Sequence, residues 1–278
     1  MVEFHRIYVD SRFRAIFSAS STDFKFELVD DLYIPPNTKC YIDDITIPIS
    51  YYSIESNIND RIYFRRVSSV ADGLNNISDD ILTIPSGNYN IESLRDAIQL
   101  LLTAKYGAGK FTVESSIRTN TFTIKILTSE NFIVVTEDEL KSGNILNGSW
   151  SGDSYDKTNT KSFSNNMKNV SGPSVFSKNG TPFASGFVDF LGVHTLYLHS
   201  NISSYNNQNY TGKCNIIKKI CVTNSFGYLQ VDNAVMESEY INVSSRIFKT
   251  LDFALTDVYG NVIDLHRGEI SFTLRFTA

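Results

Sequence analysis

Alternating apolar and polar positions recur along most of the chain. Residues 24–28 and 270–277 show this pattern most clearly, because Phe or other apolar residues alternate there with Lys, Glu, Ser, Thr or Arg. Successive side chains of a strand point to opposite faces, so a period of two predicts a strand with one buried face. Less regular stretches rich in apolar residues predict further strands at 39–47, 61–65, 111–114, 122–126, 132–136, 195–199, 216–222, 228–231 and 248–255.

Turn-forming residues separate these stretches. Pro35 and Pro36 predict a turn over 32–37, because proline has no amide proton to donate to a strand ladder. The polar segment 67–80 predicts a surface loop. Residues 1–14 are interpreted as a terminal arm.

One segment has the spacing of a helix. Between Ile91 and Leu102, apolar residues recur three or four positions apart, and Asn90 precedes them as a suitable N-cap. Gly107 stands just past the last turn, where glycine commonly ends a helix. The sequence therefore predicts a helix that begins after Asn90, followed by a hairpin within 111–126.

The distribution of these elements predicts the domain organisation. Strands lie on both sides of 80–195, whereas the helix lies inside it, so the fold is mainly β: a β-sandwich of 1–79 and 196–278 interrupted by an inserted α+β unit. Within the insertion, residues 141–185 are dominated by Gly, Ser, Asn, Lys and Thr. Such a composition predicts a long polar excursion.

Composition excludes several classes of protein. The 278 residues are 42% hydrophobic, yet no apolar run approaches the roughly 20 residues that span a bilayer, so we expect no membrane insertion. A net charge of −5 argues against a basic coat for nucleic acid, and no specific nucleic-acid binding is expected. The first six residues lack the apolar stretch of a secretory signal, which predicts synthesis in a reducing compartment.

The candidate chemistry is sparse. His194 and His199 are five positions apart, which places them on opposite faces of a strand and argues against a shared metal. His5 and His266 have no neighbouring nucleophile of a recognisable kind. The three cysteines show no metal-binding or disulfide spacing: Cys40, Cys214 and Cys221. The sequence therefore predicts no catalytic residue, no metal and no cofactor, and the protein is expected not to be an enzyme.

Two local basic pairs are the candidate interface residues. Arg12 with Arg14 and Arg65 with Arg66 stand close together in an acidic chain. Such pairs suit acidic surfaces of other proteins better than a phosphate backbone. We therefore predict these four arginines at protein interfaces.

Three stretches resemble a known family in their order along the chain: 8–48, with Tyr8-Val9-Asp10-Ser11-Arg12 and Ile34-Pro35-Pro36-Asn37; 82–94, with Pro85-Ser86-Gly87-Asn88-Tyr89; and 251–274, with Gly260-Asn261. Together they resemble the single jelly-roll penton proteins, or minor capsid proteins, of virophages and polinton (Maverick)-like viruses. The resemblance implies a single jelly-roll sandwich and a homopentamer at the fivefold vertices of an icosahedral particle. It also implies trimers of a double jelly-roll major capsid protein as partners, and location in the virion.

Two other functional hypotheses are compatible with the sequence. A glycan-binding or host-attachment jelly roll needs aromatic platforms, for which Trp150, Tyr155, Tyr205 and Tyr210 are available. An enzyme would need a reactive cluster, for example around His199 or His266.

Overall fold

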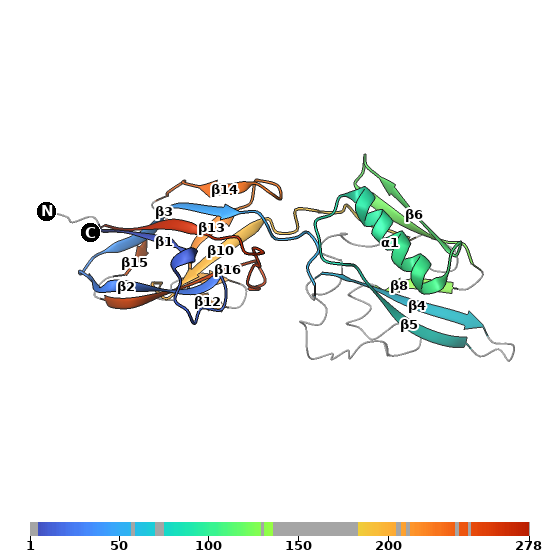
Figure 1. Cartoon of the computed structure of the whole chain (residues 1–278), viewed down its shortest axis with the longest axis horizontal. Coiled ribbons are helices and arrows are strands. Elements are labelled where there is room, and N and C mark those ends of the chain that lie inside the picture. Colours follow the sequence, from blue (N-terminus) through green and yellow to red (C-terminus); the bar gives the residue numbers. More distant parts are fainter. Residues whose placement is uncertain are drawn as a thin grey trace. The chain divides into compact units, whose positions relative to one another are not determined.

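The computed structural model describes residues 5–56, 59–69, 75–128, 131–135, 183–203, 207–209, 212–236, 239–243 and 246–277. The chain divides into two compact units (Figure 1). The first unit consists of Met1–Tyr51 and Val193–Ala278, and the second of Tyr52–Gly192. The two ends of the chain therefore share one unit, as the strand pattern predicts.

The first unit is a sandwich of two antiparallel sheets. One sheet has the order β1 (His5–Asp10), β17 (Ser271–Thr277), β3 (Lys39–Pro48) and β14 (Leu229–Asp232), with the short β15 (Ile241–Asn242) also paired to β3. The other has the order β13 (Ile216–Cys221), β10 (Thr195–Ser200), β16 (Arg246–Thr256) and β2 (Asp23–Ile34). The small hairpin β11 (Asn207–Asn209) and β12 (Gly212–Cys214) lies between β10 and β13 along the chain.

The order of the strands defines the fold. Numbered along the chain, the eight main strands follow the orders 1-8-3-6 and 5-4-7-2. This arrangement of two four-stranded sheets is a jelly roll. The predicted mainly β fold, a single jelly roll with an inserted α+β unit, is confirmed.

Apolar side chains from both sheets fill the space between them. Phe272 of β17 meets Phe253 of β16 edge to face, with 4.9 Å between the ring centroids. The Phe253 ring also lies 5.4 Å from the Phe24 ring of β2. Phe272, Leu274 and Phe276 of β17 are all buried, which confirms the buried face predicted for the last strand.

Two segments of this unit extend further as strands than the sequence predicts. Residues 5–10, interpreted as part of an arm, form β1 and pair with β17 along its length. β2 continues to Ile34, through part of the predicted turn, because Pro35 is the first residue that lacks an amide proton for the ladder. The chain then turns at Asn37, whose φ of 61° is left-handed.

The described part of the second unit contains one helix and two small sheets. The sheets have the orders β5 (Asn75–Thr83), β4 (Arg61–Ser69), β8 (Asn131–Val135) and β6 (Phe111–Ser116), β7 (Thr121–Ile126), β9 (Phe183–Ala184). Helix α1 (Ile91–Tyr106) begins where the sequence predicts. The Asn90 side chain accepts a 2.8 Å hydrogen bond from the Ser93 backbone N–H, and the Ser93 hydroxyl accepts one of 3.0 Å from the Asn90 N–H. The helix buries Leu94 and Ile98 in the core of this unit.

The position of β4 differs from the predicted domain boundary. β4 pairs with β5 from Arg61 to Ser69, so much of 67–80 is a hairpin in the second unit instead of a surface loop beside the sandwich. The polar sequence of 75–80 has no alternation of apolar and polar residues. The sequence therefore does not reveal this strand, whose pairing with β4 is made by backbone hydrogen bonds. The N-terminal part of the sandwich ends at Tyr51, whereas the predicted boundary is residue 79. Of the excursion 141–185, residues up to 182 lie outside the described part of the chain.

Candidate functional site

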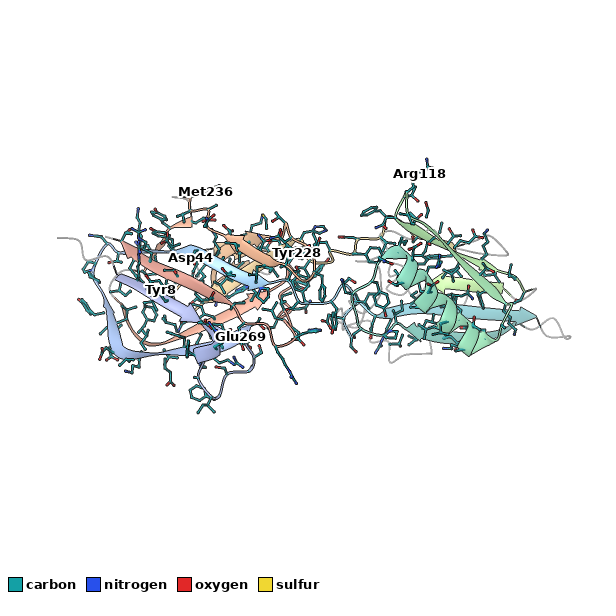
Figure 2. The ribbon with its side chains drawn as sticks, turned by 45° about the horizontal axis from the view of Figure 1, so that its top comes forward. Tyr8, Asp44, Arg118, Tyr228, Met236 and Glu269 are labelled. Atoms are coloured by element: carbon teal, nitrogen blue, oxygen red, sulfur yellow. The ribbon has the colours of Figure 1, made fainter. Side chains whose placement is uncertain are left out.

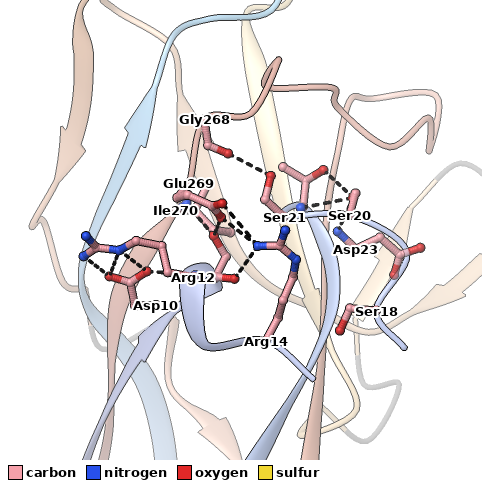
Figure 3. A network of polar contacts seen from close by, with 12 residues as sticks. Asp10, Arg12, Arg14, Ser18, Ser20, Ser21, Asp23, Gly268, Glu269 and Ile270 are labelled. Atoms are coloured by element: carbon pink, nitrogen blue, oxygen red, sulfur yellow. Dashed lines mark hydrogen bonds and ion pairs between the residues drawn. The ribbon is translucent and has the colours of Figure 1, made fainter. Parts of the chain in front are cut away.

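The segment between β1 and β2 contains two of the predicted interface residues (Figure 3). It begins with the short 3-10 helix η1 (Ser11–Phe13), directly after Asp10. The Arg12 guanidinium donates from Nε to both carboxylate oxygens of Asp10 at 3.0 Å, and the Arg12 side chain remains 68% exposed. These hydrogen bonds lower the pKa of the Asp10 carboxyl.

Arg14 connects the same segment to the residues before β17. Its Nη1 donates to the Ser11 carbonyl at 2.8 Å and to the Glu269 carboxylate at 3.2 Å. The buried Ser11 hydroxyl donates to Glu269 and accepts a 3.0 Å hydrogen bond from the Ile270 N–H. Arg14 therefore lies at the centre of a network that holds two distant parts of the sequence together.

The segment is also fixed against β2. Ala15 donates its N–H to the Lys25 carbonyl at 2.8 Å, and Lys25 donates its own N–H to the Ser18 hydroxyl at 3.0 Å. Ser20 donates to the Asp23 carbonyl at 3.0 Å. With contacts at both ends and in the middle, the segment has a defined conformation.

This fixed segment exposes three large apolar side chains. Phe13 is 74% exposed, Phe17 is 68% exposed, and Ile16 is fully exposed. We call Phe13, Ile16 and Phe17 the apolar loop. The sequence prediction for this segment names only its arginines and not these apolar side chains. The signal for them is an apolar residue on each side of Arg14 in a stretch with no strand pattern.

A second group of exposed apolar side chains lies on the edge strand β14 and on the residues next to it. Tyr228, Leu229, Val231 and Met236 are each between 55% and 69% exposed, and Figure 2 shows Tyr228 and Met236 on the surface of the unit. We call these four residues the β14 strip. Between them, Gln230 turns inward and is buried, and its side-chain oxygen accepts a 2.9 Å hydrogen bond from the Thr223 N–H. β14 therefore has one face fixed to the sandwich and one apolar face exposed.

The other predicted pair lies in the second unit. Arg65 and Arg66 are in β4, the middle strand of its sheet, where Arg65 is opposite Asp79 of β5 and Ile133 of β8. Their side chains are outside the described residues. The structure thus places the four arginines in two different units, and Arg12 and Arg14 make intramolecular ion pairs.

The described residues contain no group of three or more His, Cys, Asp or Glu side chains placed to hold a metal ion. Both ring nitrogens of His199 take part in hydrogen bonds, with Asn215 at 2.9 Å and Thr256 at 3.0 Å. Burial raises the pKa of the Cys40 thiol. Among the elements that are described, no helix is long and apolar enough to cross a membrane.

The residues named for a glycan site are outside the described part of the chain: Trp150, Tyr155, Tyr205 and Tyr210.

The order of the strands defines a single jelly-roll protein. An α+β unit is inserted between β3 and β10, the third and fourth main strands of the sandwich. The crystal structure of the mavirus penton protein has a similar fold. The structural alignment covers 99% of this chain and 100% of the mavirus chain, with a TM-score of 0.51 and 9% sequence identity. Comparison with models of protein families finds no match, and comparison with curated proteins finds none either.

Proposed function

We propose that the protein is a structural capsid protein: a penton that forms a homopentamer at the fivefold vertices of an icosahedral particle. Five copies would fill the opening left by trimers of a double jelly-roll major capsid protein, which places the chain in the virion. The observation that supports this role most directly is the likeness to the mavirus penton protein, which extends over both units of the chain.

The physical properties of the sandwich suit this role. A jelly roll buries the inner face of each sheet, so its outline is rigid and its connections and edge strands remain available for neighbours. Here the connection after β1 is held by hydrogen bonds on both sides and exposes large apolar side chains. Apolar and aromatic anchors on rigid supports are typical of permanent protein interfaces.

The test is the oligomer size of the purified full chain. With a chain mass of 31.3 kDa, a pentamer has a mass of 5 × 31.3 kDa, about 157 kDa. Mass photometry of the protein alone, and of a mixture with the major capsid protein, should detect this species in at least one condition. Monomers alone in both conditions would contradict the proposal.

A glycan array measured on the same sample separates the alternative function. Specific glycan binding by a chain that never assembles would favour an attachment module. A pentamer that binds no glycan supports the capsid role.

A further inference from the structure

We infer that the apolar loop of one copy docks on the β14 strip of the next copy, so that the subunits join head to tail in a ring. The inference rests on the proposed function, which it deepens by naming the two surfaces that meet. The partner of each surface is a second copy of this chain.

The two surfaces lie on opposite borders of the sandwich. β1 and β14 are the two edge strands of one sheet, and β2 and β13 are the two edge strands of the other. The apolar loop joins β1 to β2, so it belongs to the border that these strands form. The β14 strip belongs to the opposite border, and Figure 1 shows β14 and the dark blue segment after β1 on different sides of the first unit.

A closed ring requires this kind of arrangement. In a two-fold dimer the same patch meets itself, but in a ring of five copies each subunit must present two different surfaces. Those surfaces must lie on different sides of the subunit, so that every copy has a neighbour on each side. The apolar loop and the β14 strip fulfil both conditions within the first compact unit.

The exposed side chains of the loop supply a substantial part of a specific interface. A buried aromatic residue contributes on the order of 150–250 Å², so Phe13, Phe17 and Ile16 supply about 400 Å² of contact. This is about half of the ~800 Å² that each partner buries in a standard interface. The fixed backbone of the loop adds to this, because a preorganised anchor loses little conformational entropy on binding.

Charges on the two borders are complementary. β2 exposes Asp23, Glu27 and Asp30, while its Asp31 pairs with Lys249 of β16 and its Lys25 pairs with Asp252 of β16. On the opposite border, β13 exposes Lys219. Two described carboxylates near β14 are already paired, because Asp232 and Glu239 both face the buried Lys218 ammonium. An acidic border therefore meets one with an exposed cation when copies join head to tail.

The first experiment changes each surface separately. Phe13→Ser with Phe17→Ser alters the loop, Leu229→Lys alters the strip, and Leu100→Ser is the matched control, since Leu100 is 70% exposed on α1. Circular dichroism verifies that each variant is folded. We expect both surface variants to raise the concentration at half assembly at least about tenfold in mass photometry, whereas the control assembles like the unmodified chain.

The second experiment is a cross-link that does not depend on weakened assembly. In a Cys214→Ser and Cys221→Ser background, the double variant Phe17→Cys and Val231→Cys should, after oxidation by air, form disulfide-linked species up to the pentamer on a non-reducing gel. Each single cysteine variant should remain monomeric on the same gel, because the loop meets the strip and never another loop. The gel is run with the major capsid protein where assembly needs it.

The outcomes separate the two proposals. If the unmodified chain assembles, but the surface variants assemble normally and the double variant gives no ladder, the docking inference is wrong while the penton function stands. If the unmodified chain is monomeric in every condition, the penton function is wrong and the docking inference is overturned with it.

Discussion

The ion pair of Lys218 allows the energetics of the sandwich to be tested quantitatively. Lys218 lies on β13 with only 2% of its side chain exposed. Its ammonium donates to the Glu239 carboxylate at 2.8 Å and to the Ala234 carbonyl at 2.6 Å, and Asp232 lies 3.8 Å away. The side chains of Glu239 and Asp232 are 29% and 19% exposed, so the cation is more deeply buried than either carboxylate.

This asymmetry predicts unequal costs for removing the two partners. Glu239→Gln leaves a buried cation whose nearest carboxylate is the more distant Asp232, and uncompensated buried charges cost about 3–5 kcal/mol. Since Asp232 and Ala234 still compensate part of the charge, we expect a loss of about 3 kcal/mol. Lys218→Met removes the buried charge and preserves most of the volume, and the two carboxylates can hydrate. It should cost only about 1 kcal/mol, the size of a lost hydrogen bond.

Scanning calorimetry of the full chain measures both variants. For a unit of this size, 1 kcal/mol corresponds to roughly 4 °C, so Glu239→Gln should lower the Tm by about 12 °C and Lys218→Met by about 4 °C. The double variant should resemble Lys218→Met, because Glu239 matters only while the cation is present. A larger loss for Lys218→Met than for Glu239→Gln would refute the reasoning.

Three further predictions concern single side chains. Ile98→Ala, at a fully buried position of α1, should destabilise the second unit by about 2–5 kcal/mol, and calorimetry that detects less than 1 kcal/mol would contradict the core assignment. Asn90→Ala removes the helix cap and should cost about 1 kcal/mol in the same assay, with Asn90→Asp as the tolerated control. Arg12→Ala should raise the pKa of Asp10 toward its ordinary value of 3.8 in an NMR titration, and an unchanged pKa would exclude the hydrogen bond as its cause.

The direction of the Asp10 shift also fixes its effect on stability. A carboxyl whose pKa is lowered in the folded state stabilises the fold fully above its ordinary value of 3.8. The contribution fades as the pH falls through the lowered pKa, because the protonated carboxyl has lost the negative charge that strengthens its hydrogen bonds with Arg12. Arg12→Ala should therefore reduce stability at neutral pH and leave it unchanged at strongly acidic pH.

The sequence reveals those elements whose side chains have one buried face. β17, β16 and α1 are predicted correctly because Phe272, Leu251 and Ile98 each belong to a period that burial imposes. β5 was missed because residues 75–80 are polar, and its pairing with β4 is a backbone property. Because this pairing is not visible in the sequence, the predicted boundary of the sandwich is residue 79, whereas the structure has it at Tyr51.

The candidate surfaces were hidden for a different reason. An exposed Phe13 and a buried Phe24 are the same residue type, and only the hydrogen bonds around Ser11 and Lys25 show that the first is held outward. The β14 strip becomes meaningful only when sheet order places β14 at an edge. Composition and spacing point to the arginines, whereas tertiary structure shows Arg14 engaged with Glu269 inside the unit.

The position of the insertion preserves both borders of the sandwich. The chain leaves the first unit after Tyr51 and returns at Val193, and the Tyr51 hydroxyl donates to the Val193 carbonyl at 3.4 Å. Because the two ends of the insertion are adjacent, the sandwich needs no rearrangement of its strands to accommodate a second unit. The insertion joins β3, an interior strand of one sheet, to β10, an interior strand of the other. The edge strands β1, β2, β13 and β14 are therefore connected independently of it, and the second unit can vary without changing the surfaces through which we propose that copies join.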